Sequence, residues 1–328
     1  RRTVVLNRTP DMKSRLPPTC KRDDIVSTPA FITGDWGTTH ARLWLCAADG
    51  SICEARSAPG VSQLEGPEAV AAAFAAAVEG WSPALPAVLC GMVGSTIGWV
   101  DAGYQDCPCP LERIGGKAVR LEAQGRAVAI LPGLRVRNGF GLTDVMRGEE
   151  TQVFGAAALT GERRFVAALP GTHNKWVVVD DGVVTNFHTA LTGELYQAIS
   201  RHTVLLGGDP APVTPGPAFD AGIEAVRRNP DAGVESLVFS VRARQVTGDL
   251  PKAEAASYLS GLLIGADIRS ALGALGPERE NVPIRLICAE PLAVLYGRGL
   301  AAFGLEAQAL SGAETVRAGL HAAFRALA

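Results

Sequence analysis

The stretch at residues 31–56 reads FITGDWGTTHARLWLCAADGSICEAR, and residues 165–188, FVAALPGTHNKWVVVDDGVVTNFH, follow the same plan. In each, two apolar runs separated by a Gly-Thr pair predict two strands and a tight turn, and an Asp-Gly pair predicts the hairpin turn into a third strand. The Gly-Thr pairs begin at Gly37 and Gly171, 134 residues apart, and the Asp-Gly pairs are 132 residues apart. We therefore interpret the two stretches as copies of one three-stranded unit.

The first Gly-Thr tip has groups suited to phosphate. The backbone N–H groups of Gly37, Thr38 and Thr39 and the two threonine hydroxyls can donate to phosphate oxygens. Asp35 follows the predicted strand and could hold Mg²⁺ directly or through water, because a hard dication prefers carboxylate and phosphate oxygens. An ordinary tight turn, which also favours Asp and Gly, is the alternative for this tip alone.

The second tip decides between these alternatives. The six residues Pro170-Gly171-Thr172-His173-Asn174-Lys175 offer a glycine, a hydroxyl, an amide and an ammonium, and these groups suit phosphate. Two such tips facing each other across a cleft can hold a phosphate chain. Together they favour nucleotide binding.

Composition limits the classes of protein that remain. A chain of 328 residues is longer than one hydrophobic core usually organises, so two domains are expected. A formal net charge of −2 gives no electrostatic reason to expect nucleic acid or an anionic membrane as partner. The sequence has no apolar run of about eighteen residues, so a transmembrane protein is not expected.

The cysteines and the first residues add two expectations. Seven cysteines, an odd number scattered through strand-like runs, indicate reduced thiols in a cytoplasmic protein. Cys107-Pro108-Cys109 lacks further ligands at metal-site spacing, which favours an ordinary loop. Residues 1–29 lack the apolar core of a secretory signal, and we expect a disordered extension outside the fold.

The rest of the chain alternates between strands and helices, which predicts α/β sheets in both lobes. We expect an N-terminal lobe at residues 30–145 and a C-terminal lobe at 146–328, with 207–217 as a connecting loop. The predicted helices are 68–79, 145–159 (opened by Asp144), 253–275 and 294–303, and the further strands are 87–90, 127–131 and 284–288.

Seven motifs in order resemble the 2-dehydro-3-deoxygalactonokinase family, and the paired tips resemble the phosphate elements of the sugar kinase, Hsp70 and actin superfamily. The matching stretches are Asp35–Thr39 with Arg42, Pro59-Gly60-Val61, Gly91–Ser95 with Gly98-Trp99, Val145–Gln152, Pro170–His173 with Lys175-Trp176, Leu191–Leu195, and Leu259–Ala266.

This resemblance implies two similar lobes of the ribonuclease H-like type with a cleft between them. It implies ATP- and Mg²⁺-dependent phosphorylation of the terminal hydroxyl of 2-dehydro-3-deoxy-D-galactonate, giving the 6-phosphate and ADP in galactonate breakdown. The implied partners are the sugar acid and ATP, and a homodimer is allowed. A kinase of another small sugar or polyol, or an ATP-driven switch without enzymatic activity, are the alternatives.

Phosphoryl transfer also needs a carboxylate to receive the hydroxyl proton. Asp144 lies where related kinases commonly place this base, but a role as helix N-cap is equally expected. Glu149 and Glu150 are the rival bases. Arg147, one predicted helical turn from Asp144, could bind the substrate carboxylate with its bidentate guanidinium, and a surface salt bridge is its alternative.

The matching motifs nominate the remaining candidates. Gly261 and Gly265, at i and i+4 on an apolar helix, would allow close approach of the adenine, with tight helix packing as the alternative. Ala289 and Glu290 replace a small Gly-Ser or Gly-Thr turn of the family, which puts a Cβ where a positive φ is expected and a negative charge near the nucleotide. The remaining predicted contacts are Arg42 for the nucleotide and Gly60, Val61, Gly94, Ser95, Trp99, Thr192 and Glu194 for the substrate.

Overall fold

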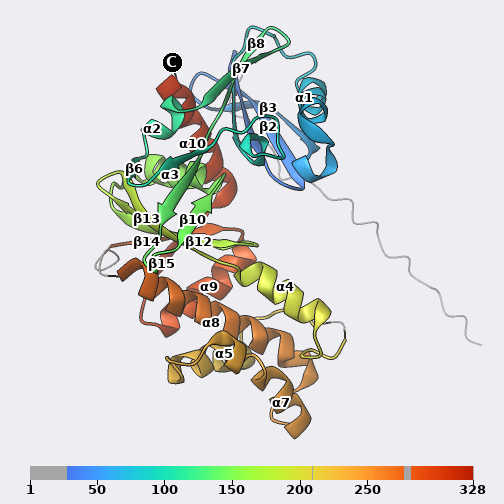
Figure 1. Cartoon of the computed structure of the whole chain (residues 1–328), viewed down its shortest axis with the longest axis vertical. Coiled ribbons are helices and arrows are strands. Elements are labelled where there is room, and N and C mark those ends of the chain that lie inside the picture. Colours follow the sequence, from blue (N-terminus) through green and yellow to red (C-terminus); the bar gives the residue numbers. More distant parts are fainter. Residues whose placement is uncertain (1–27, 209, 277–281, 328) are drawn as a thin grey trace, which may run out of the picture.

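The computed structural model describes residues 28–208, 210–276 and 282–327. Figure 1 shows two sheet-containing lobes, with the strands of the first repeat in the upper one and those of the second below them. Most of the predicted N-terminal extension, residues 1–27, lies outside the described residues. The first strand begins at Pro29, within the range predicted for that extension.

The upper lobe contains a six-stranded sheet in the order β3-β2-β1-β4-β8-β7. Neighbours are antiparallel from β1 to β2 and from β2 to β3, whereas β4 is parallel to β1 and β8 is parallel to β4. Its strands are β1 (Pro29–Trp36), β2 (His40–Ala47), β3 (Ile52–Pro59), β4 (Ala87–Gly91), β7 (Val119–Ala123) and β8 (Arg126–Ile130). Helix α1 (Gly66–Ala77) and the 3₁₀ turns η1 (Val61–Gln63) and η2 (Met92–Gly94) belong to its connections.

The lower lobe repeats this arrangement in the order β15-β14-β11-β12-β13-β6. Strand β14 is parallel to β11, and β15 is parallel to β14, as β4 and β8 are in the first sheet. The strands are β6 (Cys109–Pro110), β11 (Phe165–Leu169), β12 (Asn174–Asp180), β13 (Val183–Ala190), β14 (Ile284–Cys288) and β15 (Ala307–Ser311). Both predicted three-stranded units and the two-lobed α/β architecture are therefore confirmed.

The segment that links the lobes differs from the prediction. A helix was predicted over 145–159, but a third sheet of β5 (Tyr104–Asp106), β9 (Gly133–Arg137) and β10 (Thr143–Met146) takes its beginning, and α3 starts only at Glu149 (Glu149–Thr160). Gly148, with φ of +104°, separates strand from helix. The N-cap role predicted for Asp144 is therefore wrong, because Asp144 pairs with Val136 inside β10.

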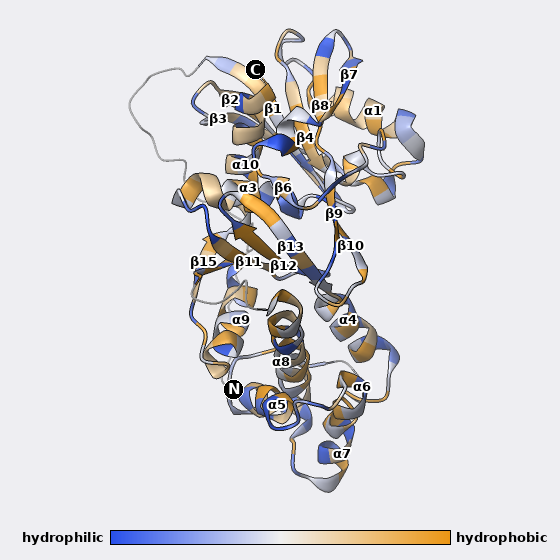
Figure 2. Cartoon of the chain, turned by 60° about the vertical axis from the view of Figure 1, so that its left-hand side comes forward, coloured by the Kyte–Doolittle hydropathy of each residue, from blue (hydrophilic) through white to orange (hydrophobic). Residues whose placement is uncertain are grey.

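Most of the remaining helices lie in the lower lobe (Figure 1). Helix α8 runs through its centre and packs along α5, and α4, α6, α7 and α9 also contact it. The bounds are α2 (Arg113–Gly116), α4 (Thr192–His202), α5 (Pro217–Arg228), α6 (Val234–Leu237), α7 (Ser240–Thr247), η3 (Lys252–Glu254), α8 (Ala255–Leu275), α9 (Glu290–Ala302) and α10 (Gly312–Leu327). In Figure 2 strand β11 is hydrophobic, whereas α5 and α7 mix hydrophilic and hydrophobic residues.

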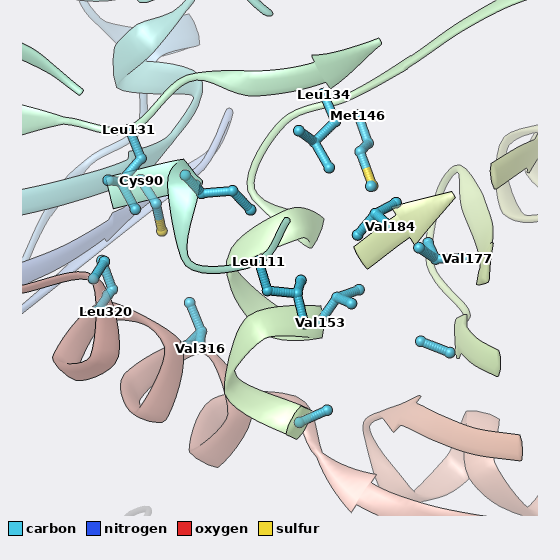
Figure 3. Close-up of a cluster of buried hydrophobic side chains, with 14 of the residues drawn as sticks. Cys90, Leu111, Leu131, Leu134, Met146, Val153, Val177, Val184, Val316 and Leu320 are labelled. Atoms are coloured by element: carbon cyan, nitrogen blue, oxygen red, sulfur yellow. The ribbon is translucent and has the colours of Figure 1, made fainter. Parts of the chain in front are cut away.

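Helix α10 comes from the end of the chain but packs against the upper lobe. Its Phe324 stacks on Phe31 of β1, with ring centroids 4.0 Å apart. Figure 3 shows Val316 and Leu320 of α10 in one buried cluster with Cys90 of β4 and Val153 of α3. One hydrophobic core therefore joins elements of both lobes, and the boundary at residue 145 stays a prediction.

Two general findings limit other roles for the described residues. Within residues 28–208, 210–276 and 282–327, no helix is long and apolar enough to cross a membrane, and no group of three or more His, Cys, Asp or Glu could hold a metal ion. Cys46, Cys90, Cys107, Cys109 and Cys288 are free thiols, whereas Cys20 lies outside the described residues.

Candidate active site

The turn that follows β3 braces the first Gly-Thr tip, which means that Gly60 and Val61 contact its backbone and hold it in place. The tip closes with the amide of Gly37 donating to the carbonyl of His40 at 2.9 Å, and the amide of Val61 donates to the carbonyl of Gly37 at 3.2 Å. Gly60 lies so close that a Cβ there would overlap the carbonyl oxygen of Thr38. Gly60 and Val61 were predicted to touch the substrate, but the contacts that the structure gives them hold the tip.

The second tip is braced in the same way by the start of α4. A Cβ at Gly193 would overlap the carbonyl of Gly171, and the amide of Glu194 donates to the carbonyl of Thr172 at 3.0 Å. The bracing glycines, Gly60 and Gly193, are 133 residues apart, within one residue of the spacing of the tips. The internal duplication thus includes the supports of the tips. Glu194, predicted as a substrate contact, instead meets the ring of His173, with Oε2 2.6 Å from Nε2.

Asp35 lies beside the first tip, at the end of β1. Its Oδ2 accepts a hydrogen bond from Arg42 at 2.6 Å, and its side chain is 21% exposed. Burial, followed by the negative charges of Asp35 and Glu150, raises the pKa of the neighbouring Cys90 well above its usual range. The Cys90 thiol, whose Sγ lies 4.0 Å from Oδ1 of Asp35, is therefore neutral.

Asp144 is held in a closed hydrogen-bond network. Its carboxylate accepts from the Thr189 hydroxyl at 2.6 Å, the Thr189 amide at 2.8 Å, the Val145 amide at 2.8 Å and the Asn138 side chain at 3.3 Å. Lys175, predicted to bind phosphate, is only 5% exposed and donates to the Val145 carbonyl and the Thr189 hydroxyl, both at 2.8 Å. Both charged side chains therefore join β10 to the second sheet.

The first turn of α3 carries two carboxylates with different surroundings. Oε2 of Glu149 accepts from the Arg147 amide at 3.0 Å, and burial raises the pKa of Glu149 against the opposing charge of Lys175. Glu150 is completely buried, and burial together with the charge of Glu149 raises its pKa to about 8. Glu149 lines a cavity next to the tips, whereas Glu150 does not.

Arg147 lies between β10 and α3 and not one helical turn from Asp144, so its predicted helical placement is wrong. Its side chain is 4% exposed, its guanidinium carbon lies 4.4 Å from the centre of the Tyr104 ring, and Nη2 donates to the carbonyl of Gly103 at 3.0 Å. The carboxylate of Asp101 lies 3.9 Å away. Nε and Nη1 are buried and have no hydrogen-bond partner, which is uncommon for a buried charged group.

A polar cavity of about 620 Å³ joins the two repeats. It brings Arg42 from beside the first tip together with the second tip, the start of α3 and the start of α10. Its lining residues are Arg42, Glu149, Gln152, Leu169, Pro170, Gly171, Thr172, His173, Ile287, Cys288, Ala289, Ser311, Gly312 and Ala313.

An apolar cavity of about 440 Å³ lies on the other side of the second tip, between α4, α8 and α9. Gly171 and Thr172 line both cavities, so the tip separates them. The other lining residues are Thr192, Gly193, Tyr196, Gln197, Val213, Ser260, Leu263, Ile264, Leu292, Leu295 and Tyr296. A larger cavity of about 690 Å³, beside Trp176 and Leu275, is lined by none of the predicted site residues.

Two expectations about the adenosine region are corrected by the backbone. Gly261 and Gly265 face α5, since a Cβ at Gly261 would overlap the carbonyl of Phe219, which supports the packing alternative. Ala289 has φ of −75°, so the expected need for a positive φ does not exist. Ala289 caps α9 and lines the polar cavity.

Three further candidates lie in the upper lobe, around η2. The hydroxyl of Ser95 donates to the carbonyl of Met92 at 2.7 Å, and the ring of Trp99 packs against Phe74 with centroids 5.2 Å apart. Gly94 adjoins the guanidinium of Arg147, because a Cβ there would lie 3.0 Å from Nη1. Of the three, only Gly94 lies beside a predicted ligand-binding group.

The sequence analysis missed one buried polar centre. Asp267 of α8 accepts hydrogen bonds from Asn174, Trp176, Thr192 and Tyr296. A single acidic residue within a long, largely apolar helix was the available signal, but its donors come from elements distant in sequence.

Comparisons with known proteins identify the family of this chain. The model of the 2-keto-3-deoxy-galactonokinase family matches residues 35–323. The chain belongs to this family. A protein of Rhizobium meliloti (strain 1021) named as a probable 2-dehydro-3-deoxygalactonokinase is 40% identical over 300 residues, 89% of this chain and 96% of that protein. The 2-dehydro-3-deoxygalactonokinase of Escherichia coli (strain K12) is 35% identical over 302 residues, 92% of this chain and 99% of its own length.

A solved structure extends the comparison to three dimensions. The crystal structure of a protein from Sinorhizobium meliloti, given the same enzyme name, has a TM-score of 0.80 and 38% sequence identity, and covers 90% of this chain and 99% of its own. As a member of the 2-keto-3-deoxy-galactonokinase family, the chain is a kinase, and ATP is its phosphoryl donor. The family membership excludes the alternative of a switch without enzymatic activity.

Proposed function

We propose that this chain carries out the reaction of its family, transfer of the γ-phosphoryl group of ATP to the terminal hydroxyl of 2-dehydro-3-deoxy-D-galactonate, in galactonate breakdown. The observation that carries this proposal is the match to the family over residues 35–323, together with two braced tips beside a divided cavity.

The divided cavity has the polarity that ATP requires. An adenine ring would enter the apolar cavity between Leu263, Ile264 and Tyr296, and the phosphates would extend past Gly171 and Thr172 into the polar cavity. Arg42 and the amides of both tips would then face the phosphate oxygens. This arrangement explains why the two cavities share the tip.

The groups beside the polar cavity also suit Mg²⁺. A magnesium ion in a kinase is usually held by one or two carboxylates and by the phosphates of the nucleotide. Asp35 supplies a partly exposed carboxylate at the first tip. A bound Mg²⁺ would neutralise phosphate charge, and Asp35 would hold it directly or through water while Arg42 turns from Asp35 to the phosphates.

Glu149 fits the role of general base better than its two rivals. Its carboxylate lines the polar cavity, and its raised pKa makes it a better proton acceptor than an exposed glutamate. Asp144 has four donors on its carboxylate, and Glu150 is completely buried. Glu149 would accept the proton of the terminal hydroxyl as the phosphoryl group is transferred.

Arg147 would hold the carboxylate of the sugar acid. Nη1 has no partner, and a carboxylate would accept from the Nη1–Nη2 edge of the guanidinium in the bidentate geometry that arginine favours. Because this edge is buried, the side chain of Tyr104, whose ring centre lies 4.4 Å from the guanidinium carbon, would have to move for the carboxylate to bind. An acid would satisfy two donors that a neutral sugar cannot satisfy equally well.

The direct test is ADP release measured with a panel of 2-keto-3-deoxy acids and neutral sugars. The keto-deoxy galactonate should have the highest kcat/KM, and preference for a neutral sugar would contradict the assigned substrate. A homodimer and a cytoplasmic location stay predictions, and light scattering of the purified chain would test the first.

A further inference from the structure

Asp267 is a buried carboxylate, 4% exposed, near the middle of α8. Its Oδ2 accepts from the Asn174 side chain at 2.6 Å, the Thr192 hydroxyl at 2.8 Å and the Tyr296 hydroxyl at 2.6 Å. Its Oδ1 accepts from the indole N–H of Trp176 at 2.9 Å. All four donors are uncharged side chains from outside α8.

These donors belong to elements that surround the nucleotide cavities. Asn174 and Trp176 are in β12, directly after the second Gly-Thr tip, Thr192 begins α4, and Tyr296 is in α9. Thr192 and Tyr296 also line the apolar cavity. One carboxylate therefore connects the tip with two of the helices around the proposed adenine site.

This network contributes more to selecting one arrangement of its helices and strand than to the free energy of unfolding. Burying a carboxylate without a cation is costly, and a well-packed apolar replacement is often as stable. Hydrogen bonds to a charged acceptor are, however, directional and stronger than those between neutral groups. A charged acceptor with four donors thus selects one arrangement of α4, α8, α9 and β12.

We propose that Asp267 is a positioning residue for nucleotide binding, which fixes the second Gly-Thr tip relative to the adenine site. It does so without lining either cavity itself. This inference rests on the proposed function, because it requires that the two cavities hold ATP. It predicts a selective defect toward the nucleotide.

The test is Asp267→Asn. The amide replaces one acceptor oxygen with a donor NH₂ that must face other donors, so the network loses bonds to a charged group. We expect the Kd for ADP, measured by calorimetry, and the KM for ATP to rise by about tenfold or more. The KM for the keto-deoxy acid should barely change. Hydrogen exchange of the amides at 171–174 should become faster, whereas that at 37–39 should not.

Two further variants keep the test decisive. Asp220→Asn makes the same substitution in an exposed ion pair with Arg298 of α9, and it should leave the ADP Kd unchanged. Asn174→Ala removes one donor from Asp267 and should raise the ADP Kd in the same direction. The double variant with Asp267→Asn should show less than the sum of the two effects, because both act through one network.

The outcomes separate this inference from the proposed function. If the wild-type chain binds no ADP, the proposed function fails. If it binds ADP and folded Asp267→Asn protein binds equally well, or loses affinity for both substrates alike, Asp267 has no positioning role. If Asp267→Asn does not fold, Asn174→Ala decides: a raised ADP Kd supports the role, and an unchanged one overturns it.

Discussion

Thr189 holds the carboxylate of Asp144 from two directions, with its hydroxyl 2.6 Å from Oδ1 and its amide 2.8 Å from Oδ2. This contact joins the linking strand β10 to β13 of the second sheet. A carboxylate that already accepts four hydrogen bonds is a poor acceptor for a substrate proton. The geometry thus directs attention from Asp144 to Glu149, five residues further on.

Replacing the base should have a large effect on turnover. Glu149→Gln keeps the shape but removes the proton acceptor, so kcat should fall by about 10²–10⁴. Asp144→Asn should lower the free energy of unfolding by about 1–2 kcal/mol through its lost hydrogen bonds, and kcat by less than about tenfold. Steady-state kinetics and urea unfolding measure the two effects. A larger kcat loss for Asp144→Asn would reverse the assignment.

Removing the charge of Asp35 should impair catalysis without unfolding the protein. Asp35→Asn should reduce kcat/KM on the order of 10²–10³, because an oriented charge beside the phosphates is lost. The thermal midpoint should hardly change, since Asp35 is partly exposed. Asp49→Asn, the same substitution in the β2–β3 turn, is the control. Near-normal turnover of folded Asp35→Asn protein would show that Asp35 does not position the metal.

The close contacts of Gly60 and Gly193 with the two tips predict that one methyl group added at either position impairs phosphate binding. Gly60→Ala and Gly193→Ala should each raise the KM for ATP, because the added Cβ overlaps the carbonyl of Thr38 or Gly171 and must displace a tip. Gly297→Ala, in α9 with no heavy atom within 4 Å of the added Cβ, should leave the KM for ATP unchanged. Wild-type kinetics in both bracing variants would mean that the tips tolerate movement.

Arg147 should determine the preference for an acid. Arg147→Lys keeps the charge but loses the planar fork, so the KM for the keto-deoxy acid should rise strongly while the KM for ATP barely moves. The loss should be greater for the acid than for a neutral sugar. Arg135→Lys, at the exposed ion pair with Asp106, should match the wild type. Equal losses on acid and neutral substrates would indicate that Arg147 supports the fold or the phosphates.

The raised pKa of Glu150 makes a prediction about stability and pH. Because its pKa is about 8 when folded, above that of an unfolded glutamate, its contribution is fully present below about pH 4.5. That contribution is lost as the pH rises toward 8, at up to about 1.4 kcal/mol per pH unit. Glu150→Gln mimics the protonated form and should remove this slope. Urea unfolding at pH 6 and pH 9 compares the two proteins, and parallel pH profiles would contradict the raised pKa.

The sequence alone was sufficient to predict the features that depend on residues close together in the chain. The strands and turns of both repeats follow from apolar runs, Gly-Thr pairs and Asp-Gly pairs, and the structure confirms them at β1–β3 and β11–β13. The tips were also identified, because the Gly-Thr pair occurs twice, and Glu149 and Glu150 were named because phosphoryl transfer needs a base.

Other features depend on distant partners and were not predictable. Residues 145–148 read as the start of a helix, but β10 forms because it pairs with β9 and because Asp144 meets Thr189, 45 residues away. The roles of Gly60 and Gly193 follow from which carbonyls they face. The role of Asp267 follows from its hydrogen bonds with Asn174, Thr192 and Tyr296, which are distant from it in the sequence.

The stacking of Phe324 on Phe31 also has a consequence for the order of events during synthesis. The ribosome releases β1 first and α10 nearly 300 residues later, yet the two cover each other in one core. Until α10 emerges, the apolar surface of β1 and β4 lacks its native cover and is open to aggregation or to chaperones. The upper lobe, although encoded first, is thus completed last.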